Sequence, residues 1–224
     1  MLRFFLVVIF VLTSTPLHAR TTTGSTAEPT EHRAFDYYVL SLSWSPTYCS
    51  SKRGKRDRSQ CGGKRAFAFV VHGLWPQYNK GWPQYCKTNQ RWVGRGRIRE
   101  MLDIMPSKRL IIHEWKKHGS CSRLGQKAYF KLTRTLFDKL LTPARYLSPK
   151  KPVFITPQQL VSDFVKTNKG LSASGLSVQC GNSRRQAALS ELRVCFSKAG
   201  DFIACGENER RRCRARTLIL PPVR

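Results

Sequence analysis

Apolar and polar side chains alternate along the first part of the chain in a way that predicts strands. At 36–44, DYYVLSLSW, the alternation is combined with aromatic and β-branched residues, as is typical of a half-buried strand. The run AFAFVVHGLW at 66–75 is more continuously apolar and predicts a second, buried strand that turns at Gly73. Short apolar segments nearer the C-terminus predict further strands at 175–180, 190–197, 201–205 and 216–220.

The middle of the chain changes to apolar positions three or four residues apart, which predict helices. Such segments lie at 97–105, 110–118 and 126–141. A fourth helix is predicted at 156–168, where Thr156 can cap the first turn, Pro157 suits the first helical position and Gln159 completes a capping box.

Helices and strands follow one another without regular βαβ alternation, which predicts a single α+β domain. We expect a central, mainly antiparallel sheet flanked by helices. The segment at 50–64, SSKRGKRDRSQCGGK, lies between the first two strands and is predicted to be a basic loop. A disulfide between Cys49 and Cys61, which bracket it, would tether this loop.

The N-terminus has the pattern of a signal peptide, which we place at 1–19. Arg3 precedes the apolar run at 4–12, and a polar stretch ends at Ala19. The alternative is a membrane anchor, but the run is far shorter than the ~20 residues of a spanning helix. Residues 20–34 are polar and rich in Thr, and are expected to form a flexible leader before a folded domain at 35–224. The protein is therefore predicted to be secreted or periplasmic, with no membrane association.

The chain contains eight cysteines and no C-x-x-C pair, which favours disulfides over metal or thioredoxin-like chemistry in an exported protein. The pattern by itself leaves the pairing open. The cysteines are Cys49, Cys61, Cys86, Cys121, Cys180, Cys195, Cys205 and Cys213.

The charge is strongly positive, with 40 Lys and Arg against 13 Asp and Glu, a formal +27. Such a field attracts RNA, DNA, acidic glycans or anionic membranes, and does not discriminate among them. A dense part is ERRRCRAR at 209–216, with five arginines between Arg210 and Arg216. Two interpretations remain open: a solvated, solubilising edge, or a track for RNA phosphates.

The segment IIHEWKKHGSC at 111–121 resembles a zinc-protease helix, but H-E-x-x-H needs histidines four apart and these are five apart. On a helix, His113 and Lys117 share one face and Glu114 and His118 share the neighbouring face. The four side chains can line one cleft, whereas the two histidines cannot approach one metal ion.

Two imidazoles, a carboxylate and an ammonium group suit phosphoryl transfer without a metal. RNA cleavage needs a base for the 2′-OH, an acid for the leaving 5′-oxygen and cations for the phosphorane. A further histidine, His72, ends the apolar strand in FVVHGLWPQ at 69–77. A lone histidine there is more often structural, but the predicted domain contains only His72, His113 and His118, all within two short motifs.

These two motifs, FVVHGLWPQ and HEWKKHGSC, resemble those of the ribonuclease T2 family of secreted, metal-independent endoribonucleases. The resemblance also includes the first strand and the cysteine layout. It implies that His72 donates a proton to the 5′-oxygen and that His118 activates the 2′-OH. It implies cleavage through a 2′,3′-cyclic phosphate, which is then hydrolysed.

The resemblance assigns the remaining motif residues as well. It implies that His113 binds the phosphate and that Glu114 and Lys117 stabilise the pentacovalent intermediate, with Glu114 counted among the catalytic residues. It implies that Trp75 stacks on a base, which every base permits through its π-face. Gln77 departs from members that carry an acidic residue there, so no particular base preference can be transferred.

The family layout also implies four disulfides. They would be Cys86 to Cys121, Cys180 to Cys213, Cys195 to Cys205 and, as the remaining pair, Cys49 to Cys61. The predicted protein is a monomeric endoribonuclease that cleaves single-stranded RNA with low base specificity, with no metal and no cofactor. The alternative is a non-catalytic cationic protein that binds nucleic acid or glycan.

Overall fold

The computed structural model describes residues 34–63, 65–210 and 212–224. The predicted signal peptide and nearly all of the predicted leader lie outside these residues. The strands are β1 Tyr37–Trp44, β2 Phe69–Gln77, β3 Val153–Ile155, β4 Leu176–Cys180, β5 Gln186–Phe196 and β6 Thr217–Leu220. The α-helices are α1 Ser45–Ser50, α2 Arg58–Cys61, α3 Arg95–Met101, α4 Lys108–Lys117, α5 Gln126–Lys139 and α6 Pro157–Thr167. Short 3-10 helices are η1 Gly54–Arg56, η2 Gly119–Cys121, η3 Ala144–Tyr146, η4 Ala173–Gly175 and η5 Glu207–Arg210.

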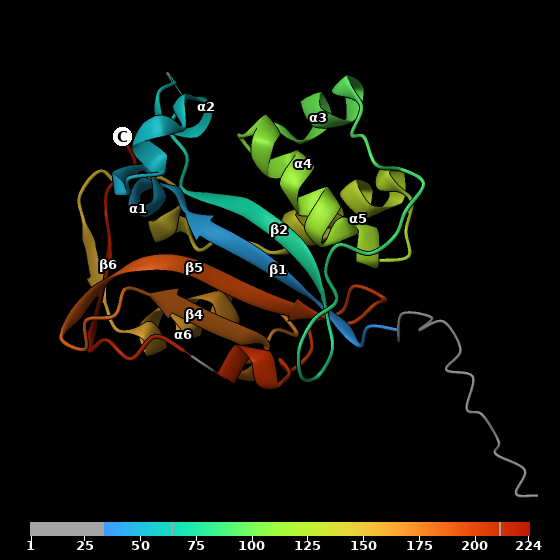
Figure 1. Ribbon diagram of the computed structural model, residues 1–224. Helices are drawn as coiled ribbons and strands as arrows, with labels where there is room; N and C mark the ends of the chain where they lie inside the picture. The colour runs from blue at the N-terminus through green and yellow to red at the C-terminus, as the bar shows by residue number, and fades with distance from the viewer. Residues whose placement is uncertain (1–33, 64, 211) are drawn as a thin grey trace, which may run out of the picture. The chain divides into compact units, whose positions relative to one another are not determined.

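The strands form one mixed sheet in the order β2-β1-β5-β6-β3, with β4 also paired to β5. Every pairing is antiparallel except that of β5 with β6. Helices α3, α4 and α5 gather beside β2, the strand at one end of the sheet order (Figure 1). The predicted α+β fold with a mainly antiparallel sheet flanked by helices is confirmed.

The alternating side chains of the strands divide the sheet into an apolar face and a more polar one. On β1, the apolar face carries Tyr38, Leu40, Leu42 and Trp44, which are all buried in the main core. Large aromatic side chains from the helices complete this core: Trp115, Tyr129, Phe130 and Phe164. Residues in between, such as Ser41 on β1 and Glu191 and Arg193 on β5, belong to the opposite face. This opposite face is where polar chemistry can be placed without disturbing the core.

A β-bulge occurs in β2 at His72. In the register with β1, Ser41 pairs with Gly73 and Leu42 pairs with Val71, so His72 is the extra residue. The apolar face of β2 accordingly carries Phe69, Val71 and then Leu74, a step of two followed by a step of three. A bulge changes the direction of the side chain at that position and is common next to active sites. It lets an apolar strand present one imidazole outward.

Four disulfides join the same pairs that the family resemblance implies: Cys49–Cys61, Cys86–Cys121, Cys180–Cys213 and Cys195–Cys205. Cys86–Cys121 ties the segment after β2 to the end of the α4 region. Each bridge closes between 10 and 35 residues and is expected to contribute about 2–4 kcal/mol. Among the described residues, no helix is long and apolar enough to cross a membrane.

Besides the start of β5, which lies at Gln186 and not at residue 190, three sequence predictions differ from the structure. Residues 201–205 form no strand: Phe202 makes a single bridge to Phe196, and the N–H of Cys205 then turns away to bond the carbonyl of Ser174. The predicted loop at 50–64 contains η1 and α2, because the Asp57 carboxylate accepts from two backbone N–H groups and caps a helical turn.

The third difference is the helix predicted at 97–105, which ends at Met101 because the chain turns there. The amides of Ile104 and Met105 both bond the carbonyl of Met101. The carbonyl of Ile104 then accepts from the N–H of Val71 in β2, which joins this turn to the strand before His72.

Candidate active site

His72 is held by a carboxylate that lies 119 positions away in the sequence. Its Nδ1 lies 2.6 Å from Oε1 of Glu191 on β5, and its Nε2 lies 3.7 Å from Oε1 of Glu114 on α4. The sheet makes this possible because β1 pairs with β2 on one side and with β5 on the other. The bulge directs the imidazole of His72 towards Glu191.

Glu114 is the buried carboxylate of the site, with 1% of its surface exposed. Its Oε2 accepts a hydrogen bond of 2.7 Å from Nε1 of Trp75. Gly73 permits this approach, since a Cβ at that position would lie 2.0 Å from the same carboxylate oxygen and 2.5 Å from the indole nitrogen. The glycine in the H-G-x-W sequence is therefore required by packing against Glu114.

The end of α4 supplies the remaining predicted residues. His113 is exposed, whereas His118, the residue that follows the last turn of α4, is buried, and its ring lies 5.3 Å from the ring of Trp75. Lys117 lies close enough to His113, Glu114 and His118 to influence the pKa of each. The structure thus brings all the predicted site residues around His72 and Trp75.

The environment of His72 favours its protonated form. Burial lowers its pKa, but the hydrogen bond to Glu191 and the negative charges of Glu114 and Glu191 outweigh burial, so the pKa of His72 is raised. Burial raises the pKa of Glu191, yet the bond to His72 and the charges of His72 and Arg193 lower it to about 2. Both shifts favour the pair of an imidazolium and a carboxylate over the neutral pair.

His118 has the opposite tendency. Burial is the largest cause that lowers its pKa to about 3, and the positive charges of Lys117, His72 and His113 lower it further. Its Nδ1 is buried with no hydrogen-bond partner among the described residues. Burial also raises the pKa of Glu114, to about 7, against the lowering effects of His72 and the Trp75 bond. The folded environment thus favours the charged form of His72 and the neutral form of His118.

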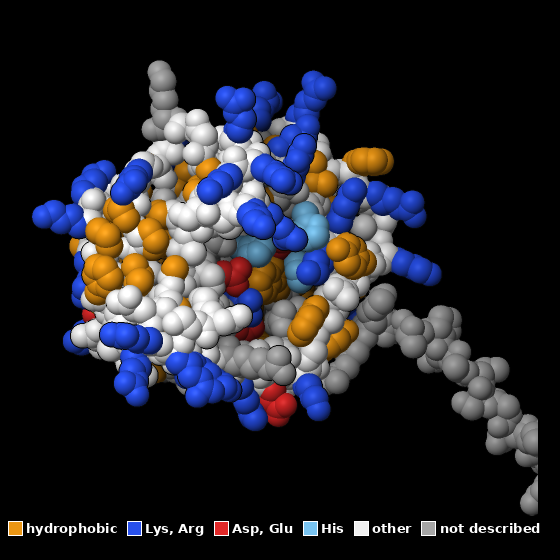
Figure 2. Space-filling model, turned by 60° about the vertical axis from the view of Figure 1, so that its left-hand side comes forward, with side chains coloured by type: hydrophobic (Ala, Val, Ile, Leu, Met, Phe, Trp, Pro, Cys, Tyr) orange, Lys and Arg blue, Asp and Glu red, His pale blue; other side chains and the backbone are white. Residues whose placement is uncertain are grey.

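Histidine side chains line a hollow on the face shown in Figure 2, beside acidic side chains and below many Lys and Arg side chains. A polymeric anion would be attracted to such a rim. The site residues His72, Glu114 and Glu191 come from β2, α4 and β5, respectively. No group of three or more His, Cys, Asp or Glu side chains that could hold a metal ion occurs in the part of the chain that the structure describes.

The model of the ribonuclease T2 family matches residues 35–205 of the chain. The chain belongs to the ribonuclease T2 family. A ribonuclease of Aeromonas hydrophila is 37% identical over 190 residues, which cover 80% of each chain. The extracellular ribonuclease LE of Solanum lycopersicum is 28% identical over 196 residues, 75% of this chain and 79% of the relative.

Solved structures agree with this family. The structure of RNase NT in complex with 5′-AMP superposes with a TM-score of 0.65 at 26% identity, covering 84% of this chain and 98% of the other. The protein is thus a T2-type endoribonuclease, and RNA is its substrate.

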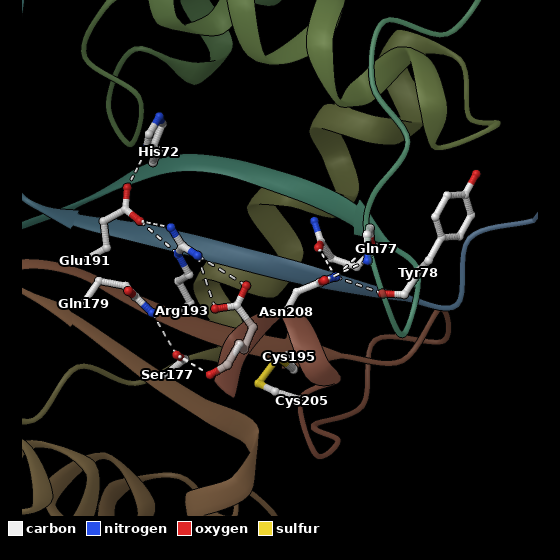
Figure 3. A network of polar contacts seen from close by, with 12 residues as sticks. His72, Gln77, Tyr78, Ser177, Gln179, Glu191, Arg193, Cys195, Cys205 and Asn208 are labelled. Atoms are coloured by element: carbon white, nitrogen blue, oxygen red, sulfur yellow. Dashed lines mark hydrogen bonds and ion pairs between the residues drawn. A yellow bond between two sulfur atoms is a disulfide. The ribbon is translucent and has the colours of Figure 1, made fainter. Parts of the chain in front are cut away.

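Sequence reasoning missed the polar network behind His72 in this T2 enzyme. The guanidinium of Arg193 donates to Glu191 and to both carboxylate oxygens of Glu209, which is 2% exposed (Figure 3). The carbonyl of Glu209 accepts from the hydroxyl of Ser177 on β4. The available signal was the alternation in SELRVCFS, which places Glu191 and Arg193 on one face of β5, opposite Leu192 and Val194.

Gln77 is buried at the end of β2. It is the position at which this sequence departs from family members that carry an acidic residue there. Its Oε1 accepts from Nδ2 of Asn208, and the same nitrogen bonds the carbonyls of Tyr78 and Gly81 (Figure 3). The side-chain oxygen of Gln77 thus helps to hold the turn after β2.

Proposed function

We propose that this T2 enzyme cleaves single-stranded RNA internally by attack of the ribose 2′-OH, with low base specificity. The product is a 2′,3′-cyclic phosphate, which water then opens to a 3′-phosphate. The observation that carries the proposal is the opposite protonation preference of two histidines beside Trp75. General acid–base catalysis of this reaction needs one proton donor and one proton acceptor.

His72 is the proton donor to the leaving 5′-oxygen. The carboxylates of Glu114 and Glu191 keep its imidazolium form stable, as a general acid requires. The same bond to Glu191 orients the ring, because Nδ1 is engaged and Nε2 is directed towards the side of Glu114.

His118 is the base that takes the proton from the 2′-OH. Burial and the cations around it keep the ring neutral, so a nitrogen lone pair is free to accept a proton. A bound phosphodiester brings negative charge next to Lys117 and His113, which offsets two of the causes that lower the pKa of His118. The base therefore becomes stronger when the substrate is in place. In the hydrolysis step the two histidines exchange roles.

The remaining groups act on the phosphate and the base. Lys117 provides positive charge for the phosphorane oxygens. His113, whose pKa is lowered by burial and by the charges of Lys117 and His72, contributes a ring N–H as a hydrogen-bond donor. Glu114, with a pKa of about 7, can donate a hydrogen bond to a phosphorane oxygen when it is protonated. Trp75 stacks on a base. Since Cζ of Arg193 lies 5.0 Å from the centroid of the Trp75 ring, a base on that face of the ring would displace the guanidinium.

The direct test is to incubate the protein with RNA in the presence of EDTA. Cleavage is expected to continue, because the proposed proton transfers use side chains alone, and 2′,3′-cyclic phosphate ends are expected among the products. Single-stranded DNA of the same sequence should remain intact because it lacks the 2′-OH. Activity that EDTA abolishes and zinc restores would refute the mechanism. RNA binding without cleavage would favour the non-catalytic alternative.

Glu191→Gln tests whether the carboxylate behind His72 sets its protonation. Removal of the negative charge lowers the pKa of His72, so less of the acid is protonated as the pH rises. The alkaline limb of the kcat/KM profile for an RNA dinucleotide is expected to move to lower pH. Glu207→Gln is a matched control, since the exposed Glu207 carboxylate forms an ion pair with the exposed Arg210 on η5, away from His72 in the sequence and outside its hydrogen bonds. Equal alkaline limbs in both variants and the parent would mean that Glu191 has no such role.

We also propose that residues 1–19 are removed as a signal peptide and that 20–34 precede a catalytic domain at 35–224. The four disulfides support an oxidising destination such as the cell exterior or the periplasm. The name of the extracellular relative from Solanum lycopersicum supports the same compartment. A monomer is proposed as the working form.

A further inference from the structure

The two most exposed aromatic side chains among the described residues follow β2, and the proposed mechanism uses neither of them. Trp92 is 83% exposed and Tyr85 is 60% exposed. A large apolar ring that faces water contributes little to folding, and several of them together on a surface usually mark a binding site. Tyr85 also has a positive φ of 53°, which costs energy for a residue with a side chain.

The backbone that carries Trp92 is firmly held. The Nε2 of Gln126 donates to the carbonyls of Gln90 and Trp92 at 2.9 and 3.0 Å, and Nε1 of Trp115 donates to the same Gln90 carbonyl at 2.6 Å. The disulfide from Cys86 anchors the start of the segment to Cys121. A fixed backbone with an outward indole is organised for a ligand before the ligand binds.

Tyr85 and Trp92 line a cavity of ≈ 840 Å³, and its lining among the described residues includes Lys and Arg side chains and no carboxylate. The charged members are Lys87, Arg91 and Lys116, and the Nζ of Lys116 lies 5.3 Å from the centroid of the Trp92 ring. The side chains of Thr88 and Asn89 add hydrogen-bonding groups. Aromatic faces beside Lys and Arg are the combination that binds unpaired nucleotides.

The cavity and the candidate active site both use residues of α4. Lys116 lies three residues after His113 on α4, so the two exposed side chains are neighbours on the helix surface. The backbone N–H of Tyr85 also donates to the carbonyl of Lys117 at 2.9 Å. An RNA chain that places its phosphate at His113 and Lys117 therefore reaches Trp92 by passing over Lys116.

We propose that this cavity is a further RNA subsite, which binds an unpaired nucleotide outside the two that flank the scissile phosphate. The base stacks on Trp92, Lys116 neutralises the adjoining phosphate, and Lys87 and Arg91 contact the phosphates beyond. The inference rests on the proposed function for its direction, because it treats the chain in the cavity as the continuation of the substrate.

The test measures binding and cleavage separately. A labelled decamer of deoxythymidine serves as the binding probe, since it offers bases and phosphates but no 2′-OH for cleavage. Trp92→Ala is expected to weaken decamer binding roughly tenfold, from the loss of one stacked base. It should raise KM for a long RNA to a similar extent and leave cleavage of an RNA dinucleotide unchanged. Trp92→Phe keeps a π-face and is expected to retain most of the binding.

Two controls distinguish this subsite from other surfaces. Phe154→Ala removes a ring that is 58% exposed on β3 and is expected to change nothing. Charge reversal of the exposed Arg210, Arg212 and Arg214 tests the C-terminal tract. If Trp92→Ala bound the decamer as the parent does and only the charge-reversal variant lost binding, the RNA would be assigned to the C-terminal tract and the proposal would be overturned. Lys116→Gln should flatten the slope of log K against log salt by roughly 0.7.

Failure of the proposed function would give a different pattern of cleavage and binding results. A parent protein that cleaves neither long RNA nor the dinucleotide would refute the catalytic mechanism, while the decamer still reports on the cavity. A parent that cleaves both, with identical KM values for the parent and Trp92→Ala, would refute the subsite alone.

Discussion

Replacement of His72 by Ala is expected to lower kcat for RNA by about 10²–10⁴-fold, because the variant loses its proton donor to the 5′-oxygen. His118→Ala should lose a similar factor, since the 2′-OH then has no base. His113→Ala is expected to be milder and to act mainly through KM, because the role proposed for its exposed imidazole is to bind the phosphate. Single-turnover rates in EDTA, with thermal unfolding as a check on folding, provide the measurement.

The two large losses should also differ in their chemistry. An RNA with an activated 5′-leaving group, which needs no protonation, is expected to be cleaved well by His72→Ala and poorly by His118→Ala. Near-normal turnover by a folded His118→Ala variant would show that the base is another group. Equal rescue of both variants by the activated substrate would show that the acid and base are wrongly assigned.

Gly73→Ala is also expected to cause a large loss of activity, although the change adds only one methyl group. The new Cβ would collide with Oε2 of Glu114 at 2.0 Å and with Nε1 of Trp75 at 2.5 Å, so one of these groups must move. A shift of this size in a reacting group can cost about 10²-fold in rate. Overpacking should also lower the free energy of unfolding by about 1–3 kcal/mol. Turnover and thermal unfolding measure the two effects.

Gly96→Ala is the matched control, because nothing lies within 4 Å of a Cβ at that position in α3. It should leave activity unchanged and raise stability by about 0.5–1 kcal/mol, since alanine is the better helix former. Full turnover in Gly73→Ala would mean that the group displaced by the methyl, Glu114 or Trp75, does not need its present position for the reaction.

The sequence predicted well those elements that depend on neighbouring residues. The capping box at the start of α6 is present as expected: the Thr156 hydroxyl accepts from the N–H of Gln159, and the Gln159 side chain accepts from the N–H of Thr156. The alternation at 36–44 gave the limits of β1 to within one residue. The strand predicted at 201–205 failed because a strand needs a continuous partner, and the partner is available only at Phe202.

The residues of the candidate site also fall into two groups, those that short motifs revealed and those that only strand pairing brings together. The motif residues His72, His113 and His118 were recognisable because each motif is a few residues long. Glu191 and Arg193 were not, since nothing near them in the sequence indicates that β1 will bring β5 to within reach of β2. The bulge at His72 is likewise a property of the register between two strands and of neither strand alone.

The sequence by itself determined the family, the local elements and the set of acid–base groups, because periodicity, caps and short motifs act over a few residues. Only the tertiary structure decided which histidine favours the charged form. The pKa of His72 is raised because strand pairing places Glu191 2.6 Å from its ring, and the pKa of His118 is lowered because packing buries it beside Lys117. Protonation depends on burial and on charges a few ångströms away, and those distances exist only once the chain has folded.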